Sequence, residues 1–226
     1  MKKGKFYGVI FLLGILAKLL RGLLYRGNLD SRGLIPAGSF LDAALWVLTA
    51  GALVLCFLAE NRKVAAKNWS IVGNAFFALG LLFSTQDLTQ GYSVLLLLCR
   101  CLTIIAALAL AAEAVQKFRG KKLPYVWILV CLSLIVRLIA AYQTWSREPQ
   151  MQDFLLPLLA GLAGAAFAYR RAAESVGLPR SPWTYRLGLA AMYLCIAASG
   201  SSQTLLFYSM TGVGCFFLSG REEGVC

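Results

Sequence analysis

Long apolar runs alternate with short polar segments along the whole chain. Each run approaches the roughly 20 residues that an α-helix needs to cross a bilayer, and no connection is long enough for a separate folded domain. The pattern predicts an all-α integral membrane protein, a bundle of about eight transmembrane helices in one domain, residues 1–226. The predicted spans are residues 6–25, 41–59, 69–84, 93–115, 125–143, 154–170, 186–199 and 202–219.

The first and last runs need a closer look. Residues 1–20 begin with lysines followed by an apolar stretch, as a signal peptide does, but no small-x-small cleavage site follows and the run continues through Tyr25. We therefore predict a retained first span. The last two spans are separated only by GSSQ (200–203), so both a tight hairpin and a single broken helix fit the sequence.

Composition agrees with a membrane setting. The mean hydropathy is +0.71, 59% of residues are apolar and 14% are charged, whereas soluble domains carry about 25% charged residues. Six cysteines fall inside apolar runs, where cysteine behaves as a small hydrophobic residue. The sequence has no histidine, which argues against a zinc or iron site, and we predict no cofactor.

The basic residues gather in alternate connections. With the amino terminus in the cytoplasm, the inner side holds Lys2, Lys3, Lys5, Arg62, Lys63, Lys67, Lys117, Arg119, Lys121, Lys122, Arg170, Arg171, Arg180, Arg186 and Arg221, and the outer connections hold Arg26, Arg32 and Arg147. This positive-inside asymmetry predicts eight spans with both termini cytoplasmic. The net charge of +12 then reports orientation and contact with anionic lipid head groups. No nucleic-acid partner is needed to explain it.

Four basic residues remain inside the spans. At about 1.5 Å per residue, Arg21 lies about 6 Å from the outer end of its span, Arg137 about 9 Å and Lys18 about 10 Å. Arg100 lies about 12 Å from Tyr92, close to the midplane of a hydrocarbon core roughly 30 Å thick. Snorkelling, in which a long side chain carries its charge back to the interface, explains Arg21. For Lys18 and Arg137 two interpretations stay open, namely snorkelling and a functional charge that faces the bundle interior.

Arg100 is the hardest charge to explain. A central arginine costs at least about 2.5 kcal/mol on insertion scales, and such residues usually face the bundle interior and have a partner. No carboxylate lies at the depth of Arg100 in the predicted spans. Backbone carbonyls, Asn74 of the third span and Thr103 are alternative partners, as is a water-filled cavity shared with Lys18 and Arg137.

All four cations fall in the outer half of the predicted bilayer. If their helices turn them inward, they form a positive pocket open to the outer leaflet, and such a pocket favours an anionic head group or solute. A purely structural, hydrogen-bonded arginine is the alternative. The candidate ligand-binding residues are Arg100, Arg137, Lys18, Arg21, Asn74, Thr103 and Tyr142.

Two sequence patterns bear on helix packing. AKLLRGLLY (17–25) and VRLIAAY (136–142) each place a basic residue before aliphatic residues and a terminal tyrosine. If these segments are equivalent, the chain consists of two parallel four-helix repeats, as occurs among transporters. The sixth span carries Ala160, Gly164 and Ala168 at spacing four, and small residues on one stripe let a neighbouring helix approach closely.

The sequence lacks the parts of a catalytic site. There is no histidine, no pair of carboxylates within a span and no Walker-type phosphate loop, and chemistry needs such groups within reach of one another. Lys18, Glu113 and Tyr142 are the plausible titrating groups within spans, and nothing in the sequence places them together. We therefore predict that the chain is not an enzyme, with intramembrane lipid chemistry as the least favoured function.

The stretch YQTWSREPQMQDFLLPLLAGLAGAAFAYRRAAESVG (142–177), with GLIPAGS (33–39), resembles a group of uncharacterised multi-pass membrane proteins from anaerobic Gram-positive bacteria. The W-S-x-x-P-Q and YRRAA segments carry the resemblance. It implies a bacterial cytoplasmic-membrane location and no particular activity.

Two functions fit these patterns. The first is a small membrane protein that binds or transports an anionic or amphipathic small molecule or lipid through the basic pocket. The second is a non-catalytic membrane partner or receptor subunit of a larger complex, or a homo-oligomer. Membrane lipids are expected contacts in both.

Overall fold

The computed structural model describes residues 5–27, 39–59, 67–84, 94–119, 123, 125–145, 152–179, 181–199 and 205–219. Within these residues the chain forms α-helices and no strands. The helices are α1 (Lys5–Gly27), α2 (Phe40–Leu58), α3 (Lys67–Ser84), α4 (Val94–Phe118), α5 (Val126–Trp145), α6 (Gln152–Ser175), α7 (Pro182–Ala198) and α8 (Leu205–Ser219). Each predicted run corresponds to one helix.

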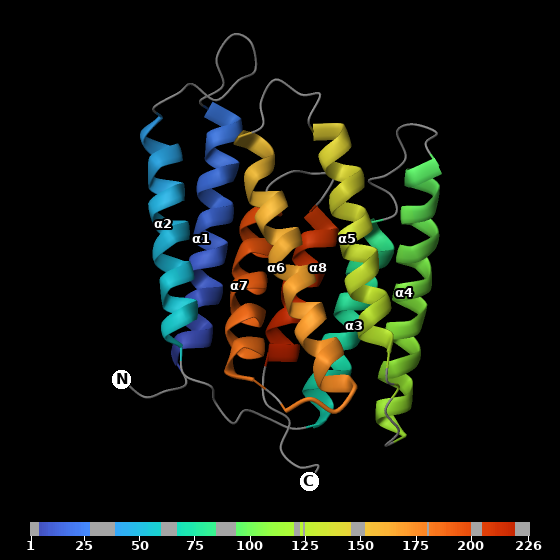
Figure 1. Ribbon diagram of the computed structural model, residues 1–226. Helices are drawn as coiled ribbons and strands as arrows, with labels where there is room; N and C mark the ends of the chain where they lie inside the picture. Colours follow the sequence, from blue (N-terminus) through green and yellow to red (C-terminus); the bar gives the residue numbers. More distant parts are fainter. Residues whose placement is uncertain are drawn as a thin grey trace.

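The helices stand side by side and run alternately up and down (Figure 1). The odd-numbered helices begin at the end of the bundle drawn at the bottom of Figure 1, which we call the lower end, and the even-numbered helices begin at the upper end. Four helices are long and apolar enough to cross a membrane, namely Tyr7–Tyr25, Phe40–Leu58, Val94–Phe118 and Val126–Gln143. The fold is thus an all-helical bundle with candidate membrane spans.

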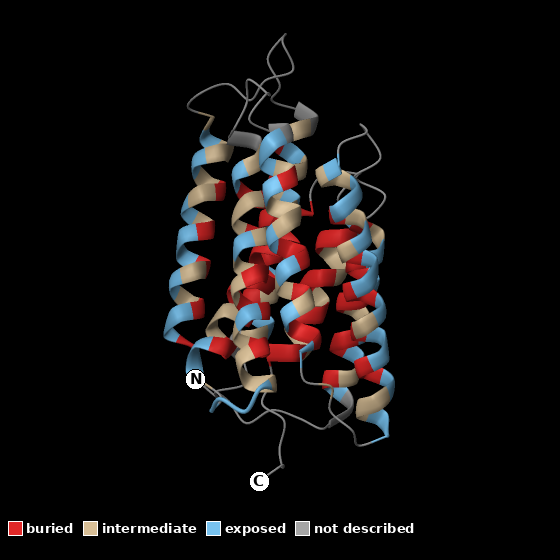
Figure 2. Cartoon of the chain, turned by 45° about the vertical axis from the view of Figure 1, so that its right-hand side comes forward, coloured by how far each residue is buried: buried red, intermediate tan, exposed pale blue. Residues whose placement is uncertain are grey.

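The outer faces of these helices are apolar. On α1, Leu12, Leu16, Leu19 and Leu23 form one exposed stripe at helical spacing. Figure 2 shows the buried residues concentrated in the middle of the bundle and the exposed ones on the outer helices. Contiguous exposed apolar stripes are rare on soluble monomers, so these faces are suited to lipid.

Six helices close into a ring. Each of α3, α4, α5, α6, α7 and α8 packs against the next, and α8 packs back against α3. α1 and α2 pack on each other and on α7, outside the ring. Because α7 has neighbours on all sides, every residue from Gly188 to Ser199 is buried. A helix in that position needs no polar face.

Glycines set the close contact between α3 and α8. A Cβ atom on Gly80 would lie 2.6 Å from the Thr211 hydroxyl, and one on Gly214 would lie 2.9 Å from the backbone nitrogen of Phe77. Small residues at a helix interface let the backbones approach closely. The predicted small-residue stripe on α6 is also buried, and Gly164 faces Leu134 of α5.

The structure decides two questions that the sequence left open. α7 and α8 are separate helices packed against each other, so of the two arrangements considered the hairpin is correct. The packing does not follow the possible four-plus-four repeat: α1 packs against α7, but the corresponding pair, α5 and α3, is not among the closely packed pairs of described helices. The loops that carry most of the predicted charge asymmetry lie outside the described residues.

Candidate functional site

Two of the four basic residues inside the predicted spans contact the ends of short helices. Arg21 of α1 is 5% exposed, and its Nη1 donates to the carbonyl of Ala198, the last residue of α7, at 2.9 Å. Arg137 of α5 donates from Nη1 to the carbonyl of Ser84, the last residue of α3, at 3.1 Å. The last carbonyls of an α-helix have no partner within the helix, and these arginines supply one.

The length of the helices explains why arginine is needed. α3 and α7 have 18 and 17 residues, whereas α4 has 25. In an apolar environment an unsatisfied carbonyl is costly, and a cation at a helix carboxyl terminus also interacts favourably with the helix dipole. Aromatic rings hold both guanidinium groups: the central carbon of the Arg21 guanidinium lies 5.6 Å from the centre of the Tyr25 ring, and that of Arg137 lies 3.8 Å from the centre of the Phe207 ring.

The sequence echo between residues 17–25 and 136–142 therefore has a shared structural role. In each segment the arginine stabilises the carboxyl end of another helix, α7 for Arg21 and α3 for Arg137. In a four-plus-four repeat, α1 corresponds to α5 and α7 corresponds to α3. The Arg21 contact with α7 and the Arg137 contact with α3 are then equivalent, although the surrounding helices pack differently.

Arg100 and Arg137 lie in the same region of the ring. Arg100 lies six residues from the start of α4 and Arg137 eight from the end of α5, both near the upper end, and these two helices pack against each other. Cys99, beside Arg100 in the chain, is buried. Thr103, one turn along α4, is also buried and donates to the carbonyl of Cys99 at 2.7 Å. We call Cys99, Arg100, Thr103 and Arg137 the upper basic site.

The other predicted site residues lie elsewhere. Lys18 and Arg21 are on α1, which packs on α2 and α7 and is not among the close neighbours of α4 or α5. Tyr142 is 53% exposed. Asn74 lies in the lower half of α3, fully buried. The structure thus places Arg100, Thr103 and Arg137 in the upper halves of the packed helices α4 and α5. Lys18, Arg21 and Asn74 lie on other helices, and Tyr142 lies between one and two turns above Arg137 with an exposed side chain.

An aromatic layer crosses the interior of the ring. Phe77 of α3 meets Trp127 of α5 edge-on, with ring centroids 5.7 Å apart, and Trp127 meets Phe167 of α6 at 6.1 Å. All three side chains are fully buried. This layer lies between the upper basic site and a second group of polar side chains nearer the lower end.

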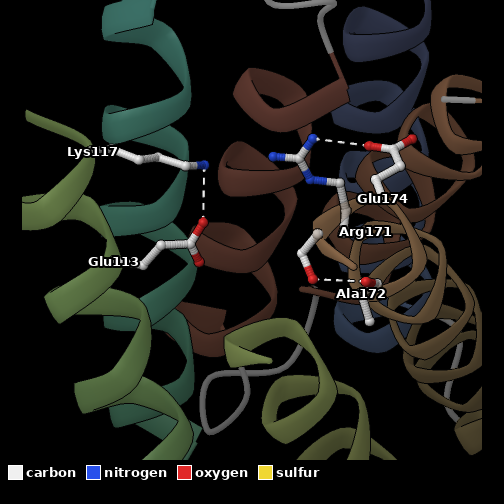
Figure 3. A network of polar contacts seen from close by, with 6 residues as sticks. Glu113, Lys117, Arg171, Ala172 and Glu174 are labelled. Carbon is white, nitrogen blue, oxygen red and sulfur yellow. Dashed lines mark hydrogen bonds and ion pairs between the residues drawn. The ribbon is translucent and has the colours of Figure 1, made fainter. Parts of the chain in front are cut away.

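Two ion pairs form this second group, with Glu113 and Arg171 buried and Lys117 and Glu174 partly buried. Lys117 and Glu113 of α4 form an ion pair at 3.1 Å, and Arg171 and Glu174 of α6 form another at 3.3 Å. The Arg171 guanidinium lies 5.4 Å from the centre of the Trp127 ring. Figure 3 shows the α4 pair and Arg171 pointing toward each other.

Arg171 is a charged residue whose burial the sequence analysis did not predict. The predicted sixth span ends at residue 170, which assigns Arg171 to an inner connection, but α6 continues to Ser175 and buries it. A signal is present in the sequence. Arg171 and Glu174 are three residues apart, a spacing that favours an ion pair on one helix face.

The three titrating groups that the sequence places within spans lie on different helices. Lys18 is on α1, Glu113 is near the lower end of α4, and Tyr142 is near the upper end of α5. Among the residues that the structure describes, no group of three or more His, Cys, Asp or Glu side chains is arranged to hold a metal ion.

Comparison of the chain with protein-family models, with curated protein sequences and with solved structures finds no match.

Proposed function

We propose that the chain is an eight-span membrane protein that binds or transports an anionic or amphipathic small molecule or lipid through the ring α3–α8. The observation that carries the proposal is the position of Arg100 and Arg137 near the upper ends of the packed helices α4 and α5, six residues from the start of α4 and eight from the end of α5. Like charges close together in an apolar interior repel each other, and a bound anion offsets that repulsion. Arginine presents five N–H donors, so Arg137 can contact Ser84 and still bind a ligand.

The orientation of the bundle follows from charge. With both termini cytoplasmic in a bacterial cytoplasmic membrane, the upper end faces outward and the upper basic site opens toward the outer leaflet. The aromatic layer then separates that site from the cytoplasmic side. Such a barrier between two polar regions suits a transport path, although binding alone needs only the upper site.

Reporter fusions test this orientation. Alkaline phosphatase fused after Gln90 or Pro149 is expected to be active, because it forms its disulfides only outside the cytoplasm. The same reporter fused after Arg62 or Lys121 is expected to be inactive, and a fluorescent protein there should fold normally. Phosphatase activity after Arg62 would contradict the proposed orientation.

Native mass spectrometry of the gently purified protein tests the site. We expect the wild type to carry an anionic lipid or metabolite, and Arg100→Gln to bind it at least about tenfold more weakly, since a charge-assisted contact is worth about 1.5–3 kcal/mol. Arg119→Gln is the matched control, because Arg119 is exposed beyond the other end of α4. Identical ligands on the wild type and Arg100→Gln would make Arg100 structural and favour the partner-subunit function.

A further inference from the structure

We propose that the lower half of the ring contains a second binding site, for a small zwitterionic molecule that carries an ammonium and a carboxylate group. The site consists of Asn74, Glu113, Arg171 and Thr184, one residue from each of α3, α4, α6 and α7. It lies on the other side of the aromatic layer from the upper basic site, and it does not depend on that site being occupied.

The strongest observation concerns Asn74. Its side chain is 0% exposed, and neither the amide oxygen nor the amide nitrogen has a hydrogen-bond partner among the described residues. A buried amide can donate two hydrogen bonds and accept two. Leaving all of them unmade is strongly unfavourable, so an asparagine at this position destabilises the protein unless something else occupies the site.

Of the other buried polar atoms without a hydrogen-bond partner among the described residues, three belong to the remaining residues of the proposed site. Glu113 Oε2, Arg171 Nε and Thr184 Oγ1 have no hydrogen-bond partner among the described residues, and all three side chains are more than nine-tenths buried. Together with Asn74 they offer both donors and acceptors. Native interiors leave few polar groups unpaired, so several in one half of one ring indicate a binding site.

The register of the helices places these groups on one side of the aromatic layer. Asn74 precedes Phe77 by three residues on α3, and Arg171 follows Phe167 by four on α6. Both steps are about one helical turn toward the lower end. Thr184 lies one turn below Gly188, where a Cβ atom would be 3.0 Å from the Phe167 ring.

Glu113 completes the site from α4. It lies five residues from the end of α4, and Asn74 lies seven from the start of α3, about 8 Å and 10 Å from the lower ends of these two packed helices. Figure 3 shows the carboxylate of Glu113 turned toward the side of the bundle on which Arg171 lies.

The charge of the site selects the ligand class. Glu113 and Glu174 carry two negative charges, and Lys117 and Arg171 carry two positive ones. Within these two ion pairs the charges sum to zero, in contrast to the two arginines of the upper basic site; Arg170 and Arg186 lie at a similar depth on α6 and α7, outside these pairs. Glu113 presents a free carboxylate oxygen to an ammonium group and Arg171 a free N–H to a carboxylate, while Trp127 offers an apolar surface. A zwitterion matches all three features.

The side of the proposed site that faces the lower end of the bundle also carries one positive and one negative side chain. Lys117 lies one turn nearer the lower end than Glu113, and Glu174 lies nearly one turn nearer than Arg171. Both are more exposed than their partners, 11% against 5% and 13% against 9% for the side chains. A zwitterion approaching from the lower end therefore meets one charge of each sign first.

The shift in melting temperature on adding a ligand to the full chain in detergent tests the proposal. The probes are L-alanine, L-leucine and L-glutamine, with acetate and ethylammonium as single-charge controls. We expect at least one amino acid to raise the melting temperature and neither control to do so. No response to any of the three amino acids would overturn the proposal.

Asn74→Leu separates a binding site from a water-filled structural network. Leucine has nearly the same shape and no polar atoms, so we expect the ligand-free variant to melt at a higher temperature than the wild type and the amino-acid shift to be lost. Ser133→Ala is the control, because Ser133 is equally buried but donates to the carbonyl of Val130; its ligand shift should match that of the wild type. A lower melting temperature for Asn74→Leu, or a retained shift, would overturn the proposal.

Discussion

Replacing Gly214 by alanine is expected to lower the free energy of unfolding by about 1–3 kcal/mol, the usual cost of overpacking a well-packed interior. The added Cβ atom would lie 2.9 Å from the backbone nitrogen of Phe77 and 3.1 Å from the carbonyl oxygen of Gly73. Backbone atoms cannot rotate away as a flexible side chain can. α3 must therefore move relative to α8, and larger residues at position 214 should cost more.

Gly51→Ala is the matched control. Gly51 lies in the middle of α2, and a Cβ atom added there would have no neighbour within 4 Å, so the same methyl group meets nothing. Alanine is the better helix former by about 1 kcal/mol, and this variant should be neutral or slightly more stable. Unfolding in mixed micelles, followed by circular dichroism, measures both. Equal losses in Gly214→Ala and Gly51→Ala would show that the α3–α8 contact is looser than the structure indicates.

Arg21→Gln is expected to destabilise the protein by about 1.5–3 kcal/mol, the range for a hydrogen bond to a charged group. The substitution removes the 2.9 Å bond to the carbonyl of Ala198 and the contact with the Tyr25 ring. It leaves the carboxyl end of α7 with an unsatisfied carbonyl next to the buried face of α1. The same unfolding titration measures the loss.

Two further variants identify the cause of that loss. Arg21→Lys keeps the charge and one donor, so it should recover part of the stability. Lys18→Gln removes a half-buried charge on the same helix that makes no hydrogen bond or ion pair with the described residues, and it should change stability by less than about 1 kcal/mol. If Lys18→Gln proves as damaging as Arg21→Gln, positive charge on α1 matters for insertion rather than for capping α7.

The number and position of the helices could be predicted from the sequence. Apolar runs long enough to cross a bilayer are a local property, because a helix in lipid must satisfy its backbone hydrogen bonds within itself. Each predicted run corresponds to one helix, and α6 differs most, since its last two turns carry Arg170, Arg171 and Glu174, charged residues at which a hydropathy criterion ends the span. For this reason the hydropathy pattern does not reveal that Arg171 is buried.

The grouping of side chains from different helices could not be predicted. The sequence places four basic residues, Lys18, Arg21, Arg100 and Arg137, in the outer half of the predicted bilayer. Their depth does not specify which helices are neighbours. Only the packing places α1 outside the ring and α4 beside α5, which separates Arg21 from Arg100.

The sequence by itself therefore determined the secondary structure of this protein, the apolar surface of its helices and the presence of four basic residues inside predicted spans. The tertiary structure alone decided what those charges contact. It showed that Arg21 and Arg137 stabilise the carboxyl ends of short helices, and that Asn74 is buried without a hydrogen-bond partner among the described residues. The physical reason is that helix formation depends on local residues, whereas the partner of a buried polar group depends on which distant helix lies beside it.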